Sequence, residues 1–274
     1  MLDAKTIFED LRKIRTHVPL VHNVTNFVVM RQTADALLAL GASPVMAHAA
    51  EEMVDMVHLA NAVVINMGTL DAQWVDSMLL AMEVAGQTHV PCVFDPVGAG
   101  ATPYRTKVAQ TMISRGTPLI IRGNAAEIRA LVEESRETKG VDSLVSSDSA
   151  IAAARHIVRQ YQHTVVISGE RDFIITRDQE FSVCNGVTMM TKVVGMGCTA
   201  SALLGAFAAI NPNFLAASVH TMAVMGVAGE IALEKSQGPG SFQAAFLDML
   251  YNLSYLQLAG RVKISNSLSC INSI

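Results

Sequence analysis

Six short apolar runs recur along the first two thirds of the chain, and each has about the length of one β-strand. They cover residues 19–25, 43–48, 62–68, 91–98, 118–124 and 163–170. Nearly all are continuously apolar rather than alternating, which is the pattern of strands covered on both faces of a sheet. The sequence therefore predicts a largely parallel sheet that is buried between two layers.

Helical patterns separate these runs. Apolar positions with helical spacing fill residues 26–41, 71–87, 102–116 and 148–162. The spacing of Ile7, Phe8, Leu11 and Ile14 predicts one more amphipathic helix near the start of the chain. Thr102 before Pro103 is typical of a helix cap followed by the first helical residue. Because strands and helices alternate, we predict an α/β fold with helices on both faces of a mostly parallel central sheet.

The pattern changes after residue 170. Residues 173–186 predict a hairpin that turns at Asp178-Gln179 and forms an antiparallel edge, and a polar strand end is expected to lead into Gly195. From Gly197 to about Gly260 the chain is almost wholly helical in pattern. The polar residues 261–274 predict a loosely held tail. No repeat or linker interrupts the chain, so we expect residues 1–274 to form a single domain.

The composition indicates that much apolar surface is hidden. The chain is 51% hydrophobic and 16% charged, with a mean hydropathy of +0.35. No formally charged residue occurs between Lys192 and Glu230, but residues 211–213 (Asn-Pro-Asn) divide this run into two shorter segments. The first would span roughly 21 Å as a helix, short of the ~30 Å hydrocarbon core of a membrane. Helices buried in a core or a subunit interface therefore explain the run better than a membrane span.

Charge and cysteine usage exclude several classes of partner. The net charge is −4 and Lys and Arg form no cluster, which argues against nucleic acid. The cysteines lie far apart, without the spacing of a metal site, and reduced thiols are the simplest interpretation: Cys92, Cys184, Cys198 and Cys270. The first helix is too charged for a signal peptide. We expect a cytoplasmic protein with neither a membrane nor a nucleic-acid partner.

Small or polar residues follow five of the predicted strands where the next helix begins. These residues are 23–26, 66–69, 95–100, 122–124 and 168–170. In open parallel sheets, ligands bind beyond the carboxyl ends of the strands. The pattern therefore predicts a pocket along one rim of the sheet.

The segment Gly195-Met196-Gly197-Cys198 precedes a helix of small residues. Two glycines let backbone N–H groups approach a charged ligand, and the free N–H groups of the helix start complete a cradle for an anion. The alternative is a tightly packed helix start. Neither the P-loop pattern nor G-x-G-x-x-G is present.

Two further motifs each allow a structural and a functional interpretation. Asn124 with Glu127 is a capping box, or Glu127 lies near a metal ion that accompanies a phosphate, with Arg122 as the phosphate clamp. Asp95 is part of an Asp-Pro turn, or its carboxylate holds Mg²⁺ directly or through water. Residues 238–242 predict a turn with Ser241 as N-cap.

Six motifs occur together between residues 19 and 242: PLVHNVTN, LLALGASPVMA, DPVGAGAT, IRGNAAEI, TKVVGMGC and GPGSF. In this order they resemble the hydroxyethylthiazole kinase family, which has the ribokinase-like fold. The resemblance implies phosphorylation of the primary alcohol of 4-methyl-5-(2-hydroxyethyl)thiazole with ATP and Mg²⁺, a step of thiamine salvage. It also implies a homotrimer with active sites between subunits, which would account for the apolar composition.

The resemblance implies three groups of site residues. They are Arg122, Ser168 and Gly197 for ATP, then Met46, Gly195, Asn26 and Gly68 for the thiazole, and Glu127 and Asp95 for the metal. Ser168 stands where relatives often have Thr, which keeps the hydroxyl. From pattern alone Met46 is a core methionine.

Cys198 is the implied catalytic residue, since thiazole kinases commonly have Cys where other ribokinase-like kinases have Asp. A helix start lowers the pKa of a thiol toward neutrality, although a bound triphosphate opposes this. Cys198 would then act as a weak base in a reaction dominated by positioning, or as a space-filling residue beside the substrate. Competing hypotheses are a hydroxymethylpyrimidine kinase, a nucleotide-dependent NAD(P)H-hydrate dehydratase and a nucleotide-binding sensor.

Overall fold

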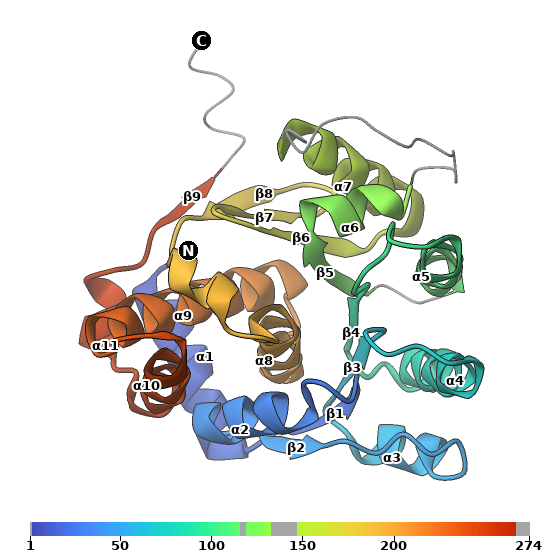
Figure 1. Cartoon of the computed structure of the whole chain (residues 1–274), viewed down its shortest axis with the longest axis horizontal. Helices are drawn as coiled ribbons and strands as arrows, with labels where there is room; N and C mark the ends of the chain where they lie inside the picture. The colour runs from blue at the N-terminus through green and yellow to red at the C-terminus, as the bar shows by residue number, and fades with distance from the viewer. Residues whose placement is uncertain (1, 116–118, 133–146, 267–274) are drawn as a thin grey trace.

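The computed structural model describes residues 2–115, 119–132 and 147–266. Within them the strands form a nine-stranded sheet in the order β2-β1-β3-β4-β5-β6-β7-β8-β9 (Figure 1). The strands are β1 (Leu20–Val24), β2 (Ser43–Val45), β3 (Ala62–Asn66), β4 (Cys92–Asp95), β5 (Ile120–Asn124), β6 (Thr164–Ser168), β7 (Asp172–Ile175), β8 (Glu180–Val183) and β9 (Ile264–Asn266). The first six pair in parallel and the last three are antiparallel. The predicted α/β architecture is confirmed.

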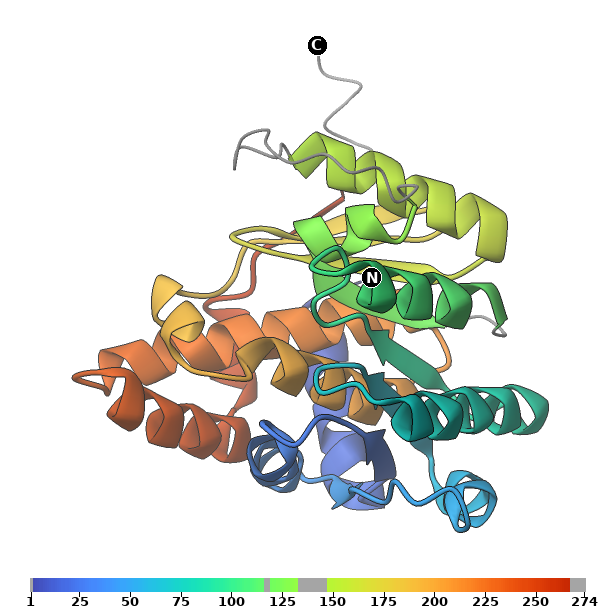
Figure 2. The ribbon, with the colours of Figure 1, turned by 45° about the vertical axis from the view of Figure 1, so that its right-hand side comes forward.

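Helices cover both faces of the sheet (Figure 1). One face carries α1 (Ala4–His17), α2 (Met30–Leu40), α8 (Met196–Ile210), α9 (Phe214–Glu234), α10 (Pro239–Asn252) and α11 (Tyr255–Ala259). The other carries α3 (Met53–Leu59), α4 (Ala72–Thr88), α5 (Pro103–Arg115), α6 (Ala125–Ala130) and α7 (Ser147–Tyr161). Figure 2 shows α7, α5, α4 and α3 following one another along this second face.

Two hydrophobic cores result, one on each side of the sheet. Neighbouring residues of a strand contribute to opposite cores, as Val93 and Phe94 of β4 do. This division explains why the strands are continuously apolar, because both faces of each strand are buried.

The charge-free run lies in α8 and α9 and is part of the first core. Helix α9 is long and apolar enough to cross a membrane, but 89% of its apolar 18-residue stretch is buried inside the protein. The interpretation of the run as buried helices is confirmed for this chain. Asn213 caps α9 by accepting a hydrogen bond from the Ala216 N–H at 3.1 Å, which explains why the run breaks there.

Several local predictions are confirmed. Helix α1 buries Ile7, Leu11 and Ile14. The Thr102 hydroxyl accepts a hydrogen bond from the Arg105 N–H at the start of α5. Strands β7 and β8 form the expected antiparallel hairpin.

Three local predictions are wrong, and one helix was not predicted. Residues 264–266 form β9 and pair with β8, so the tail is ordered up to that point and β8 is not the edge strand. Without β9, the backbone N–H and C=O groups along the outer side of β8 would have no partners. Residues 267–274 lie outside the described residues. The segment before Gly195 contains the 3₁₀-helix η1 (Thr188–Lys192) instead of a strand end. Gly238, not Ser241, is the N-cap of α10, and the Ser241 hydroxyl accepts hydrogen bonds from the N–H groups of Gln237 and Gly238. Helix α3 follows no strong apolar period and was not expected.

Candidate active site

The carboxyl ends of five parallel strands place polar side chains along one rim. In the register of the sheet, Asn66 of β3 lies beside Asp95 of β4, and Asn124 of β5 lies beside Ser168 of β6. Strands β2 and β3 flank β1 on opposite sides, so the strand order reverses at β1. Open α/β sheets often bind ligands beyond the carboxyl ends of strands at such a reversal, and Asn26 and Asn66 lie on this part of the rim, after β1 and at the end of β3.

Asp95 is the centre of a buried polar network. Its Oδ2 accepts hydrogen bonds from Asn66 Nδ2 at 2.9 Å and from Ser201 Oγ at 2.8 Å, and Arg122 Nη1 lies 3.8 Å away. Burial raises the pKa of the Asp95 carboxyl to about 6, although the positive charge of Arg122 opposes this. The other oxygen, Oδ1, is buried and has no partner among the described residues. A ligand or ion at this rim would find one unused carboxylate oxygen.

Cys198 is the third residue of α8 and faces the same network. Asn26 Nδ2 lies 3.8 Å from the Cys198 sulfur and donates a hydrogen bond to Asn66 Oδ1 at 2.7 Å. Burial raises the pKa of the thiol to about 11, and the negative charge of Asp95 adds to the effect. The expectation of a lowered pKa is therefore wrong, because burial and a nearby carboxylate both disfavour the thiolate.

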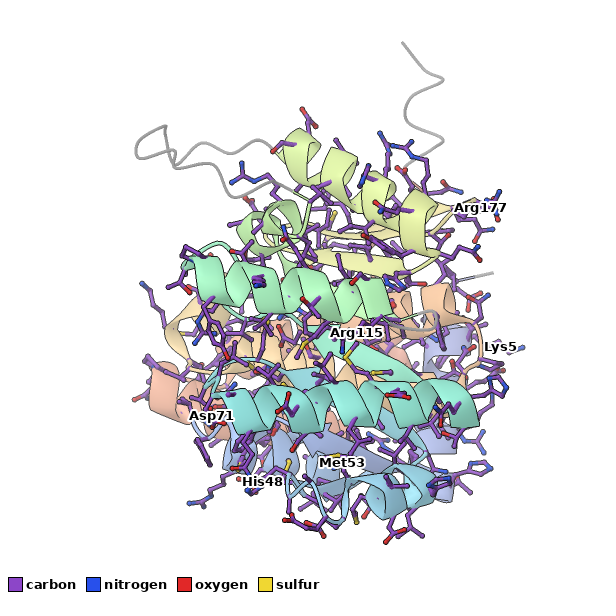
Figure 3. The ribbon with its side chains drawn as sticks, turned by 90° about the vertical axis from the view of Figure 1, so that its right-hand side faces the viewer. Lys5, His48, Met53, Asp71, Arg115 and Arg177 are labelled. Carbon is purple, nitrogen blue, oxygen red and sulfur yellow. The ribbon has the colours of Figure 1, made fainter. Side chains whose placement is uncertain are left out.

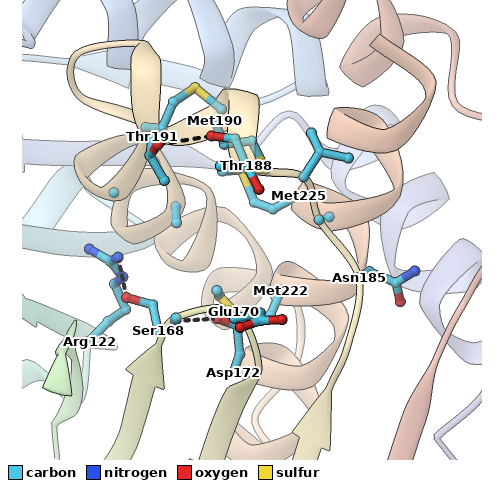
Figure 4. A pocket seen from close by; sticks show the side chains of 17 residues that line it. Arg122, Ser168, Glu170, Asp172, Asn185, Thr188, Met190, Thr191, Met222 and Met225 are labelled. Carbon is cyan, nitrogen blue, oxygen red and sulfur yellow. Dashed lines mark hydrogen bonds between the residues drawn. The ribbon is translucent and has the colours of Figure 1, made fainter. Parts of the chain in front are cut away.

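Arg122 and Gly197 meet at one end of a large cavity. The guanidinium donates a hydrogen bond from Nη2 to Ser168 Oγ at 2.5 Å (Figure 4). A Cβ atom at Gly197 would lie only 2.9 Å from Arg122 Nη1, so glycine leaves the room that the guanidinium occupies. These residues, expected from the sequence to contact ATP, are brought together by the structure.

The cavity has a volume of about 660 Å³ and a mixed lining. Arg122 and Ser168 lie on one side, the carboxylates of Glu170 and Asp172 lie beside Met222, and α9 and η1 supply the methionines: Met190, Met222 and Met225 (Figure 4). Sequence analysis missed these methionines because Met222 and Met225 lie within an unbroken apolar run that reads as core. Flexible thioether side chains suit a flat apolar ligand.

Asp172 is a second feature that the sequence analysis missed. It is the first residue of β7, lines the cavity, and accepts a hydrogen bond from the Gly169 N–H at 3.0 Å (Figure 4). Burial raises the pKa of its carboxyl to about 7, against the effects of that hydrogen bond and of Arg122. An acidic residue two positions after Glu170, in a strand that is otherwise apolar, was the available signal.

Glu127 forms the capping box with Asn124 and also reaches the turn after β4. Its Oε2 accepts a hydrogen bond from the Asn124 N–H at 2.8 Å, and its Oε1 accepts one from the Gly98 N–H at 2.9 Å. Its charge also acts on Asp95, whose pKa it raises. The structural interpretation, a capping box, is thus confirmed.

The donor set fits one metal chemistry in particular. The described residues contain no group of three His, Cys, Asp or Glu side chains that could hold an ion unaided. Mg²⁺ does not need such a group, because it keeps several waters and binds one or two carboxylates together with substrate phosphates. The unused Oδ1 of Asp95, whose carboxyl also feels the negative charge of Glu127, is compatible with a hydrated Mg²⁺ of this kind.

The residues implied for the thiazole divide into two sets. Gly195 has φ +77° and a Cβ there would lie 2.7 Å from Val29 Cγ1, while a Cβ at Gly68 would collide with the Asn26 side chain. Gly68 and Asn26 are thus in close contact next to Cys198. Met46 lies just beyond the outer strand β2, is half-buried, and does not line the 660 Å³ cavity.

Comparisons with known proteins agree on one family. The model of the hydroxyethylthiazole kinase family matches residues 11–255. A hydroxyethylthiazole kinase from Syntrophus aciditrophicus is 52% identical, covering 93% of this chain and 94% of that protein. One from Aliivibrio salmonicida is 50% identical, covering 96% and 99%. A solved hydroxyethylthiazole kinase from Pyrococcus horikoshii superposes with a TM-score of 0.88 at 42% identity, covering 96% of this chain and 99% of that one.

Proposed function

The chain belongs to the hydroxyethylthiazole kinase family, and on this premise we propose that it transfers the terminal phosphoryl group of ATP to the primary alcohol of 4-methyl-5-(2-hydroxyethyl)thiazole. Its fold is ribokinase-like, as in its relatives. The observation that carries the proposal is that Arg122, Ser168 and Gly197 converge at one end of a nucleotide-sized cavity. The product would enter thiamine salvage.

The chemistry of the cavity lining favours one orientation of ATP. The triphosphate is placed against Arg122, the Ser168 hydroxyl and the free N–H groups at the start of α8, because these donors suit anionic oxygens. The base is placed among Met190, Met222 and Met225. Gly197 lets the chain approach the phosphate without a side chain between them.

The alcohol is placed on the β1 side of the rim. Asn26 and Gly68 form its nearer wall with Gly195, and Met46 closes the side toward β2. Its hydroxyl then points toward Cys198 and the phosphate. In phosphoryl transfer the transition state is loose and little charge builds on the attacking oxygen, so alignment matters more than proton removal. We assign Cys198 a positioning role, since its thiol is held protonated.

The cation is Mg²⁺. Asp95 and Glu127 would hold it, directly or through water, beside the triphosphate. When bound, Mg²⁺ neutralises charge that develops on the phosphate oxygens. Arg122, whose Nη1 lies 3.8 Å from Asp95 Oδ2, would add a second positive charge near these oxygens.

Self-association is part of the proposal. Val28 and Val194 are 67% and 68% exposed, and they lie within two residues of the site residues Asn26 and Gly195. A homotrimer whose active sites lie between subunits would cover these side chains. We further propose that the chain acts in the cytoplasm as a single domain. Light scattering of the purified protein tests the trimer, and a monomer at micromolar concentration would contradict it.

The decisive assay measures ATP consumption with hydroxyethylthiazole and with hydroxymethylpyrimidine, each with and without Mg²⁺. We expect turnover with the thiazole that requires Mg²⁺, and much weaker turnover with the pyrimidine. A preference for the pyrimidine would favour the competing hypothesis of a hydroxymethylpyrimidine kinase. ATP-dependent dehydration of hydrated NAD(P)H, or nucleotide binding without turnover of either alcohol, would overturn the assignment.

A further inference from the structure

Three aromatic rings from distant parts of the sequence gather beside the proposed alcohol site. The ring of Phe27 meets that of Trp74 edge to face, with centroids 4.7 Å apart at 70°. His48 stacks on Trp74 at 4.6 Å and 7°, and it lies 6.5 Å from Phe27. We call Phe27, His48 and Trp74 the aromatic wall.

The loops that carry the aromatic wall are the loops that carry the proposed substrate contacts. Phe27 follows Asn26 directly, and its N–H donates a hydrogen bond to Thr69 Oγ1 at 3.3 Å, beside Gly68. His48 Nδ1 lies 3.4 Å from the Met46 carbonyl oxygen. Phe27 and His48 are therefore within two residues of Asn26 and Met46 along the chain, and Trp74 of α4 packs against both rings.

Trp74 forms a buried base of the aromatic wall, and Phe27 is its exposed side chain. Trp74 is only 7% exposed, and its indole Nε1 is buried without a partner among the described residues. Phe27 rests on it but is 61% exposed. Next to the wall lies a cavity of about 290 Å³ that is lined by His48, Trp74 and Asp71, and Figure 3 shows His48 and Asp71 at the same end of α4.

A large exposed ring on a buried platform has a direct use at a binding site. Aromatic rings attract one another in edge-to-face and offset geometries, with an energy beyond that of the area they bury. An open-chain alcohol can cover the Phe27 ring but gains little of this additional energy. The wall thus discriminates between a planar ring and a flexible chain.

We propose that the aromatic wall, through Phe27, is the specificity-determining element that selects alcohols borne on a planar aromatic ring. This inference rests on the proposed function, because it assumes that the alcohol binds beside Asn26. Phe27 contacts the ring, Trp74 holds Phe27, and His48 closes the opposite side. None of the three takes part in phosphoryl transfer.

Fluorescence provides a direct test, since Trp74 is the single tryptophan of the chain. Titration with hydroxyethylthiazole in the absence of ATP should change the emission of Trp74, with saturation near the kinetic KM for the alcohol. ATP alone should leave the emission unchanged, because no residue of the aromatic wall lines the 660 Å³ cavity. An emission that ignores the thiazole at saturating concentration would overturn the proposal even if the kinase assay succeeds.

Kinetics of variants provide a second, independent test. Phe27→Ala should raise KM for hydroxyethylthiazole about tenfold, equivalent to about 1.4 kcal/mol, with KM for ATP unchanged. For 2-(methylthio)ethanol, which keeps the hydroxyethyl group and a sulfur but lacks the ring, KM should change by less than about twofold. Phe27→Tyr should restore the wild-type KM. Equal effects on both alcohols would show that Phe27 merely supports the fold.

The controls separate this proposal from its premise. Tyr251→Ala removes an aromatic side chain that is equally exposed, at 69%, but lies on α10, and it should leave both KM values unchanged. Light scattering of Phe27→Ala checks that its subunit assembly is unaltered. Trp74→Phe allows the same comparison of KM values for a substitution at the buried residue on which Phe27 rests. If no alcohol is phosphorylated at all, the proposed function fails; if the thiazole is phosphorylated but Phe27→Ala and Trp74→Phe behave as wild type, the wall proposal alone fails.

Discussion

The protonation state of Cys198 makes a sharp prediction about the pH dependence of turnover. Burial and the charge of Asp95 raise the pKa of the thiol to about 11. At pH 7 a thiol with that pKa is ionised in only about one molecule in 10⁴, and at pH 9 in about one in 10². A mechanism in which the thiolate removes the proton would therefore gain about a hundredfold in kcat over this range.

We expect no such gain, because the reaction needs alignment of the hydroxyl more than a base. The kcat of the wild-type enzyme with saturating ATP and Mg²⁺ should change by less than about threefold between pH 7.5 and 9. Cys198→Ala should reduce kcat by about tenfold or less, because the Arg122–Ser168 contact and the start of α8 remain. Its pH profile should run parallel to that of the wild type.

The assay couples ADP formation to a readout that is insensitive to pH over this range, with ATP affinity measured separately for each variant. Cys198→Asp, which restores the residue of other ribokinase-like kinases, should keep activity or raise it. A log-linear rise of kcat with pH in the wild type, absent in Cys198→Ala, would refute the reasoning. So would a loss of more than about a hundredfold in Cys198→Ala with ATP binding intact.

Three further predictions concern the nucleotide, the metal and the fold. Gly197→Ala places a Cβ about 2.9 Å from Arg122 Nη1 and should raise KM for ATP about tenfold. An unchanged KM in steady-state kinetics would contradict the proposal that the start of α8 binds the triphosphate. Glu127→Gln loses the charge and keeps only one acceptor oxygen, so the N–H of either Asn124 or Gly98 loses its partner and the melting temperature should fall by about 2–6 °C. Half-saturation by Mg²⁺ should rise about tenfold, and an unaltered Mg²⁺ titration would argue against a metal role. Burial would raise the pKa of Asp10, but hydrogen bonds, first that of His220, outweigh it and lower the pKa to about 2. The ionised carboxylate therefore contributes stability above about pH 4, and this stability is lost as the pH falls toward 2. The free energy of unfolding of Asp10→Asn, measured in urea, should be about 1–2 kcal/mol lower than that of the wild type at pH 7, with a smaller difference at pH 3. An equal difference at both pH values would count against this linkage.

Local structure was largely predictable from the sequence. Residues 102–116 predicted a helix that begins at Pro103, and the hairpin at Asp178-Gln179 forms as expected. These predictions succeeded because capping, proline geometry and apolar period act between residues a few positions apart. The tail failed, since the pairing of Ile264–Asn266 depends on the open edge of β8, which is more than 80 residues earlier in the chain.

The candidate site divides along the same line. The sequence marks Asp95, Arg122 and Ser168 as strand-end residues, and their convergence follows from a parallel sheet. Asp95 and Ser168 do end β4 and β6, but Arg122 lies two residues before the end of β5, so its long side chain and not its strand position brings the guanidinium to the rim. It could not show that one side chain, Glu127, caps helix α6, accepts a hydrogen bond from the Gly98 N–H and raises the pKa of Asp95. The methionines of the cavity were hidden because a side chain that lines a pocket and one that fills a core have the same apolar character.

By itself, then, the sequence determined the alternation of strands and helices, the glycine-rich start of α8 and the family to which the chain belongs. Only the tertiary structure decided that the Cys198 thiol is held protonated, that one oxygen of Asp95 is unused, and that Phe27 rests on Trp74. The physical reason is that pKa values and ring contacts depend on burial and on charges brought close by packing. Neighbours along the chain carry none of that information.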